Sequence, residues 1–174
     1  MKRLLTIFRR DDRGHASIEF VIMFPLFFWI MVSAIDIGII TMRSALLERA
    51  LDVVVRDIRL STGTAPDHDE IRRRICAENA VVKDCTENLM LEMQIVDMRA
   101  WSDLPSRTTC TNQAEETQPL TTFENGMDNE LMILRACAKI TPMFGEQGIG
   151  PYLNKDSNGD VAIFALSAFV QEPR

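Results

Sequence analysis

The residues of this sequence that could do chemistry stand at the edge of an apolar stretch. Glu19 directly precedes a run, residues 20–35, that carries no charged side chain. An ionisable side chain at the edge of a membrane-spanning helix is energetically costly, and such a residue points by default to a function. Gly14 precedes Glu19 by five positions and ends a short basic leader. We therefore expect the carboxylate of Glu19 to pair with a cation.

The apolar run that would position Glu19 is long enough to cross a bilayer. Residues 20–40 form a stretch of 21 residues, and about 20 are needed. A secretory signal peptide has a shorter apolar core that ends at small residues. The sequence Val-Ser-Ala at 32–34 is a weak candidate for such a site, because the run continues beyond it. Asp36, near the outer end, is predicted to lie at the interface and reach water.

Charge is distributed unevenly along the chain. The net charge is −6, but the first fourteen residues hold five Lys and Arg against two Asp, which gives the leader +3 and the remainder −9. The acidic remainder argues against nucleic-acid binding. Basic residues beside a spanning segment stay in the cytoplasm. The leader therefore predicts a cytoplasmic N-terminus and an exported chain after Ile40.

Several of these residues resemble a known family. Gly14, Glu19 and Phe20, followed by an apolar helix, resemble the class III signal of type IV pilins and pseudopilins. The sequences Phe-Pro-Leu at 24–26 and Ile-Asp-Ile-Gly at 35–38 resemble, more narrowly, the TadE-like segment of minor pilins from tight-adherence (Tad, or Flp) pilus systems. The resemblance covers about residues 10–60. It implies that a prepilin peptidase cuts between Gly14 and His15 and leaves the helix attached.

The implied roles agree with the chemistry of the matched residues. A protease that cuts beside a membrane needs an extended, unhindered residue before the cut, and the glycine at 14 has no Cβ and little helical preference. The new amine of His15 would be a cation at a helix N-terminus, where the macrodipole disfavours it. Glu19, one turn along, would offset that charge, or would pair with the amine of a neighbouring subunit during assembly. The resemblance gives Phe20 the same assembly role.

The chain is predicted to divide into four parts: a cleaved leader (1–14), a transmembrane helix (15–41), a stalk extension of that helix (42–63) and an extracytoplasmic domain (64–174). Apolar residues at spacings of three and four from Leu47 to Ile58 predict that the stalk packs one face against the domain. The sequence Ser-Thr-Gly at 61–63 supplies a helix stop.

The exported domain is predicted to be α+β. Asp67 with Glu70 three residues later is typical of a capped helix, here expected over residues 66–79. Alternating residues over 89–95 and apolar runs over 131–140 and 161–170 predict three strands, the last two central or covered on both faces. Residues 103–130 are expected to form a long loop. The predicted product is a small antiparallel sheet packed on the stalk helix, a pilin-like architecture.

Four cysteines lie in the exported part, which predicts an oxidising compartment and two disulfides. Three pairings exist. We favour Cys76 with Cys85, which would close the exit of the second helix, and Cys110 with Cys137, which would tie the long loop to a strand. Pairing Cys85 with Cys110 would require the chain to bypass the intervening strand. The spacings lack any C-x-x-C pair, so zinc is disfavoured.

Other chemical signals are weak. Residues 154–159 resemble the first half of an EF-hand loop, but Ala165 stands where the bidentate glutamate is required, so a glycine-containing hairpin turn is favoured. His68 among acids is predicted to be a solvated surface residue. Arg72, Arg73 and Arg74 are predicted to form a solvated face, with docking of an acidic partner as the alternative. No cofactor, metal site or catalytic pairing of a nucleophile with a base is expected.

The sequence is compatible with three functions. The first is a minor pilin that a prepilin peptidase processes and that works with other minor and major pilins and an inner-membrane assembly platform. The protein would sit in the inner membrane as a single-pass protein with its C-terminal domain in the periplasm, or be incorporated into the pilus. The second is an uncleaved, membrane-anchored binding module. The third, an envelope enzyme, is the least favoured.

Overall fold

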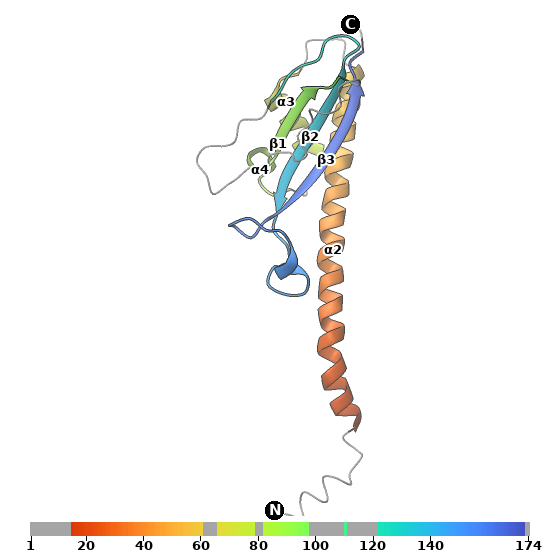
Figure 1. Cartoon of the computed structure of the whole chain (residues 1–174), viewed down its shortest axis with the longest axis vertical. Helices are drawn as coiled ribbons and strands as arrows, with labels where there is room; N and C mark the ends of the chain where they lie inside the picture. Colours follow the sequence, from red (N-terminus) through yellow and green to blue (C-terminus); the bar gives the residue numbers. More distant parts are fainter. Residues whose placement is uncertain (1–14, 61–65, 79–81, 98–109, 111–121, 173–174) are drawn as a thin grey trace, which may run out of the picture.

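The structure is a computed structural model of the chain (Figure 1). It describes residues 15–60, 66–78, 82–97, 110 and 122–172. Within these residues a long helix carries a small sheet domain at its C-terminal end, and the rest of the helix extends away from that domain. This is the predicted α+β architecture.

The long helix, α2, spans His15–Leu60, 46 residues, which corresponds to a length of about 70 Å. It runs without interruption through Pro25 and through the predicted boundary between membrane helix and stalk. The helix stop expected at 61–63 lies outside the described residues.

The surroundings of α2 change along its length. Large apolar side chains are exposed all round the helix between Ile18 and Met31. From Leu47 onward the helix instead buries one stripe, which consists of Leu47, Leu51, Val54, Val55 and Ile58. The predicted amphipathic stalk is confirmed, and its apolar stripe is part of the core of the domain.

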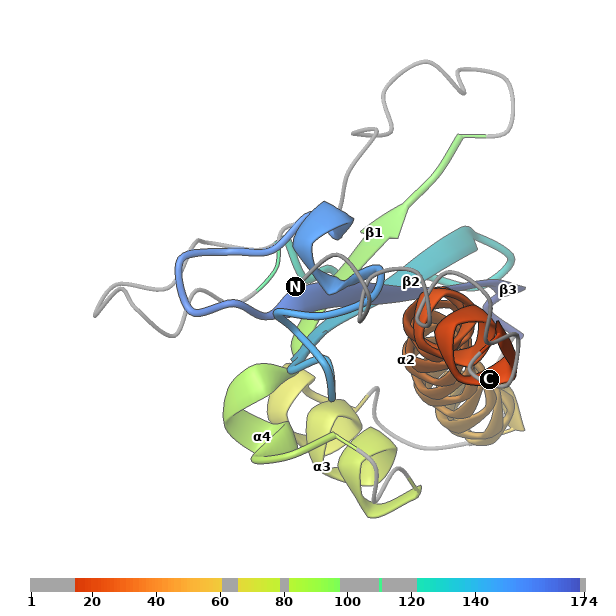
Figure 2. The same ribbon diagram turned by 90° about the horizontal axis from the view of Figure 1, so that it is seen from below.

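The sheet contains β1 (Met90–Ile95), β2 (Leu131–Ile140) and β3 (Val161–Val170), in the order β1-β2-β3 with antiparallel pairing. Figure 2 shows α2 and α3 on the same side of this sheet. Leu134, in the middle of β2, pairs with Met93 on one side and Ser167 on the other. The core therefore lies between the sheet and these two helices.

The three predicted strands are present, but the expected covering of β3 is wrong. β2 is central and almost entirely buried, as expected. Of the other two strands, β3 pairs only with β2, so it is an edge strand of the sheet, and α2 packs against it. Phe164, Leu166 and Val170 on its other face are exposed. An apolar run shows that at least one face is covered, and here only one is.

Helix α3 (His68–Glu78) begins as its sequence predicts. The backbone N–H of Glu70 donates to Asp67 Oδ1 at 2.7 Å, the expected cap. Ile71 and Ile75 are buried against the core. Arg72 pairs with Asp69, and Arg74 pairs with Glu70. Local carboxylates thus balance part of the arginine cluster, as suits a solvated face.

His68 differs from the prediction of a solvated residue. Its side chain is only 28 % exposed, and its ring meets Phe123 edge-to-face at a centroid distance of 5.1 Å. Nδ1 contacts Asp69 Oδ1 at 3.2 Å. This hydrogen bond, with the charge of Arg72, lowers the pKa of Asp69. His68 therefore joins α3 to the segment that pairs with β1 through the Met93–Phe123 bridge.

Both disulfides that the sequence favours are formed: Cys76 with Cys85, and Cys110 with Cys137. Cys85 begins the four-residue helix α4 (Cys85–Asn88), which the sequence did not predict. Cys137 is fully buried in β2, opposite Phe164 of β3. The first bond joins α3 to α4. The second fixes residue 110 of the expected long loop to the central strand, while most of that loop lies outside the described residues.

The two disulfides should contribute unequally to stability. On the chain-entropy model, alanine at both Cys110 and Cys137 should lower the free energy of unfolding by about 3.5 kcal/mol, because this bond closes the longer loop. Alanine at both Cys76 and Cys85 should cost about 2.5 kcal/mol. Urea unfolding of the full chain in detergent, followed by circular dichroism, gives both values. A larger loss on removal of the Cys76–Cys85 bond would contradict this ranking.

Candidate functional site

The N-terminal end of α2 carries the residues predicted for processing and assembly. The helix begins at His15, directly after Gly14. Gly14 itself and the His15 side chain lie outside what the structure describes, so cleavage at this position stays a prediction. Glu19 lies in the second turn, and its side chain is exposed. None of the described residues forms a hydrogen bond or ion pair with Glu19, so its carboxylate is open to another molecule.

Phe20 begins an aromatic row along α2. Its ring stacks on Phe24 at 5.1 Å between centroids, and Phe24 stacks on Phe28 at 6.1 Å. The spacing of four residues places all three rings on one face of the helix. All three remain exposed. This face is suited to contact with hydrocarbon or with another apolar helix.

Asp36, the second acid of the apolar helix, joins α2 to the connection between β2 and β3. Its side chain is 1 % exposed. Asp36 Oδ1 accepts hydrogen bonds from the backbone N–H of Met143 at 3.0 Å and of Phe144 at 3.2 Å, and Oδ2 lies 3.3 Å from the Phe144 nitrogen. The prediction that Asp36 reaches water is wrong, because two main-chain donors replace water at the buried carboxylate.

The approach of this connection to α2 depends on a glycine. Gly148 has φ +58°, a conformation that glycine adopts readily. A Cβ at Gly148 would lie 2.8 Å from Ser33 Oγ and 3.1 Å from the Ser33 nitrogen. Ser33 Oγ in turn donates to the Trp29 carbonyl at 2.8 Å. Any larger residue at 148 would push the connection away from the helix.

Beside this contact lies an apolar cavity of about 350 Å³ between the helix and the connection. It is lined by Pro25, Phe28, Trp29, Val32, Glu146, Gln147, Gly148, Pro151 and Tyr152. Aromatic and proline side chains form much of its wall. It offers no grouping of reactive residues, and its character suits an apolar ligand surface.

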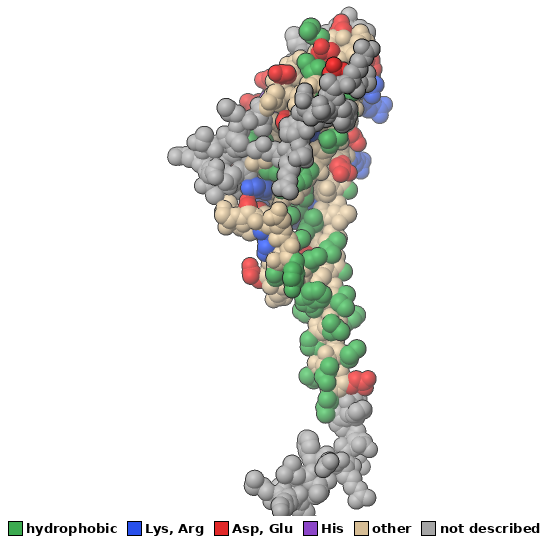
Figure 3. All heavy atoms as spheres, viewed as in Figure 1, with side chains coloured by type: hydrophobic (Ala, Val, Ile, Leu, Met, Phe, Trp, Pro, Cys, Tyr) green, Lys and Arg blue, Asp and Glu red, His purple; other side chains and the backbone are tan. Residues whose placement is uncertain are grey.

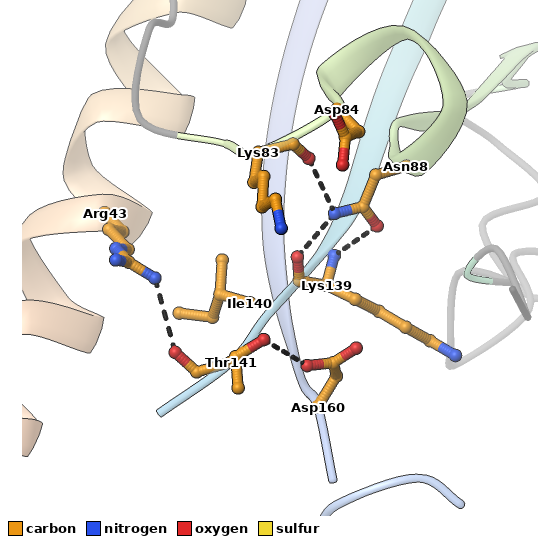
Figure 4. A pocket seen from close by; sticks show the side chains of 8 residues that line it. All are labelled: Arg43, Lys83, Asp84, Asn88, Lys139, Ile140, Thr141 and Asp160. Atoms are coloured by element: carbon orange, nitrogen blue, oxygen red, sulfur yellow. Dashed lines mark hydrogen bonds between the residues drawn. The ribbon is translucent and has the colours of Figure 1, made fainter. Parts of the chain in front are cut away.

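A second, polar cavity of about 250 Å³ lies nearer the C-terminal end of α2, between that helix, the start of α4 and the end of β2 (Figure 4). Its polar groups are largely engaged with one another. The Asn88 side chain donates to the Lys139 carbonyl at 2.6 Å and accepts from the Lys139 N–H at 3.1 Å. Thr141 Oγ1 donates to Asp160 Oδ1 at 2.6 Å, and Arg43 donates to the Thr141 carbonyl at 3.5 Å. These bonds hold three elements together, which is a structural role.

The segment that resembles half of an EF-hand is a turn. Asp156 Oδ1 accepts the backbone N–H groups of Asn158 and Asp160, both at 2.9 Å, and Oδ2 accepts Lys139 Nζ at 2.7 Å. Gly159 has φ +82°. Burial raises the pKa of Asp156, but these hydrogen bonds outweigh it and the pKa lies below its usual value. The carboxylate that would bind a cation is therefore already occupied, as the hairpin reading requires.

The fold and these contacts define a class of protein: an apolar helix, long enough to span a membrane, that carries a small α+β domain. Among the described residues, the helix at Ser17–Leu60 meets the length and composition of a membrane span. Its most apolar window is only 6 % buried, so the core helix of a soluble domain is a poor description of it.

Comparison with known proteins identifies the segment further. Residues 14–56 match the family model described as TadE-like protein. The match covers about a quarter of the chain and includes Gly14, Glu19, Phe20 and Asp36. The N-terminal segment is thus similar to TadE-like proteins, in agreement with the resemblance seen in the sequence. No curated protein and no solved structure matches the chain.

Asp36 is the functional residue whose role the sequence did not reveal. Its donors are main-chain N–H groups more than a hundred positions away, and no side-chain pattern marks them. The one signal in the sequence was the energetic cost of placing an acid within an apolar helix, since such an acid needs a partner unless it reaches water.

Replacing Asp36 with alanine should detach the connection from α2. The N–H groups of Met143 and Phe144 would lose their acceptor at the buried end of the contact, and we expect a loss of about 3 kcal/mol in unfolding free energy. Hydrogen exchange measured by mass spectrometry should become faster in the peptide that covers residues 141–153. Asp52, an exposed acid on the same helix, is the matched control, and its alanine variant should change stability by less than about 0.5 kcal/mol. Equal exchange in the two variants would contradict the contact.

Proposed function

We propose that the chain is a minor pilin, or pseudopilin, of a Tad/Flp-type pilus assembly system that serves adhesion or secretion. A prepilin peptidase removes residues 1–14. Helix α2 holds the mature protein in the inner membrane, with its N-terminus on the cytoplasmic side and the sheet domain in the periplasm, before or instead of entry into the pilus. Its partners are other minor and major pilins and the inner-membrane assembly platform. Its role is structural and not enzymatic.

One observation supports this proposal above the others: the TadE-like segment carries an exposed carboxylate, Glu19, near the start of an exposed apolar helix. After cleavage the amine of His15 stands one turn before Glu19. Helices that pack side by side with an axial offset can place the Glu19 of one subunit against the amine of the next. Inside a bundle of apolar helices that ion pair has few competitors, so it would set the register of assembly.

The competing function is an uncleaved, membrane-anchored binding module. The exposed apolar face of β3, with Phe164, Leu166 and Val170, favours some recognition by the domain. Both functions use the same anchor, and they differ in maturation. Intact-mass measurement of the membrane-extracted protein distinguishes them, because only the pilin loses residues 1–14.

Gly14 should be required for maturation. In Gly14→Val, a branched Cβ stands beside the bond to be cut, and we expect the protein to keep its full mass. Gly38→Ala is the matched control, since a Cβ at Gly38 would meet nothing within 4 Å. That variant should be shortened normally. Recovery of a shortened Gly14→Val protein would argue against the cleavage site.

Glu19 should govern assembly and leave insertion intact. Glu19→Ala keeps an apolar helix that still spans, so the protein should reach the membrane and be cut after Gly14. It should no longer co-purify with the other pilins or support filaments, because the amine of the neighbouring subunit loses its partner. Glu19→Asp, which keeps the charge, should restore assembly in part. Normal filaments from Glu19→Ala would show that the pairing is wrong.

A further inference from the structure

We propose that residues 142–153, the first part of the connection between β2 and β3 and called the connection below, form a second membrane contact of this protein. It would lie in the outer headgroup layer of the bilayer, beside α2, with the lipid surface itself as its partner. Figure 1 shows this connection below the sheet and alongside the helix, away from the rest of the domain. The inference requires that α2 spans the membrane, and it does not depend on a role in pilus assembly.

The depth of the contact follows from helix geometry. The run without a charged side chain, residues 20–35, ends at Asp36, and we take this residue as the outer end of the hydrocarbon-spanning part of α2. The connection touches α2 at Asp36 and, through Gly148, at Ser33 and Val32. Val32 lies four residues, or about 6 Å of helix, below Asp36. Segments that lie in a membrane interface penetrate about 5–10 Å into the boundary between headgroups and acyl chains, so the connection lies at that level.

The surface of the connection is suited to this layer. Tyr152 is 81 % exposed and Met143 is 63 % exposed, although both are large and apolar in part. In Figure 3 the hydrophobic surface at the lower end of the domain continues onto the hydrophobic surface of the helix. A tyrosine with an apolar ring and a polar hydroxyl is typical of membrane interfaces. The exposed residues of the connection are therefore suited to the same headgroup layer that surrounds α2 at this depth.

The backbone of the connection is adapted to a medium poor in water, where each unpaired N–H is costly. Pro142 and Pro151 have no N–H to satisfy. The N–H groups of Met143 and Phe144 donate to Asp36. Four more N–H groups donate to carbonyls within the connection. The donors are Gln147, Gly150, Tyr152 and Leu153. Most of its backbone donors thus need no water.

Two exposed polar residues limit how deep the connection can go. Glu146 and Gln147 lie at its surface. An ionised carboxylate in the hydrocarbon core would be costly, whereas the headgroup layer solvates it. Their presence places the connection in the headgroup layer and excludes a re-entrant position in the acyl core.

The test places a single tryptophan on the connection of the full chain. Trp29 and Trp101 are changed to phenylalanine, and Tyr152→Trp, at an exposed position, supplies the probe. The protein is inserted into phosphatidylcholine–phosphatidylglycerol vesicles. We expect a blue-shifted emission, loss of intensity with lipid brominated near the headgroup end of the acyl chain, weaker loss with lipid brominated near the tail, and little quenching by acrylamide.

Two control proteins make each outcome decisive. With Trp29 kept as the sole tryptophan, quenching by brominated lipid reports insertion of α2 independently. With Met127→Trp as the sole tryptophan, the probe stands at the opposite end of the sheet, at a residue that is 73 % exposed, and acrylamide should quench it. The proposal is overturned if the probe at 152 behaves like that at 127 while Trp29 is quenched by lipid.

A second copy of the chain is the other occupant to be tested. Dilution of the protein at constant lipid concentration should leave the lipid quenching at position 152 unchanged, because a lipid contact needs no neighbour. Shielding of the probe that appears only at a high protein-to-lipid ratio would assign this surface to a neighbouring chain and overturn the membrane contact.

Discussion

The structure depends on one helix that must meet two environments. Between Phe20 and Met31, α2 is apolar on all sides, which suits a lipid surrounding and no aqueous one. From Leu47 on, one stripe packs against the domain and the remaining faces are mostly polar. Between these parts a further contact joins the helix to the domain, beyond the packing of the stripe. Asp36, through the Met143 and Phe144 amides, provides that connection where the surroundings change.

Much of the fold could be predicted because its signals are local. The apolar runs at 131–140 and 161–170 give the bounds of β2 and β3, and turn residues separate them. Asp67 marks the start of α3 through a cap that involves neighbouring residues only. The disulfide pairing also follows from proximity, since each favoured partner was the nearest cysteine that the expected elements allowed. A four-residue helix such as α4 is too short to show a period, so it was missed.

The features that sequence did not provide are those that depend on distant parts of the chain. Whether β3 is covered on one face or both is decided by what packs around the sheet, and an apolar run is compatible with either. His68 is half-buried because Phe123, which lies far along the chain, packs against its ring. Asp36 is buried because a connection more than a hundred residues away presents two amides to it. The residue types at these positions show that burial would be costly, but they do not show which distant residue offsets that cost.

Glu19 and Asp36 place the same chemical group at two depths of one apolar helix, with opposite outcomes. The charge of Asp36 is met by donors of its own chain, so it has nothing to offer another subunit. Glu19 is exposed, and no described residue meets its charge, so its carboxylate is accessible to water and to other molecules. When apolar helices pack together and exclude water, an unpaired carboxylate costs several kcal/mol, roughly, and a cation from a neighbouring chain removes that cost. At Asp36 the cost of desolvating the carboxylate is offset by hydrogen bonds from the connection of the same chain. At Glu19 the same cost would favour contact with a cation of another molecule.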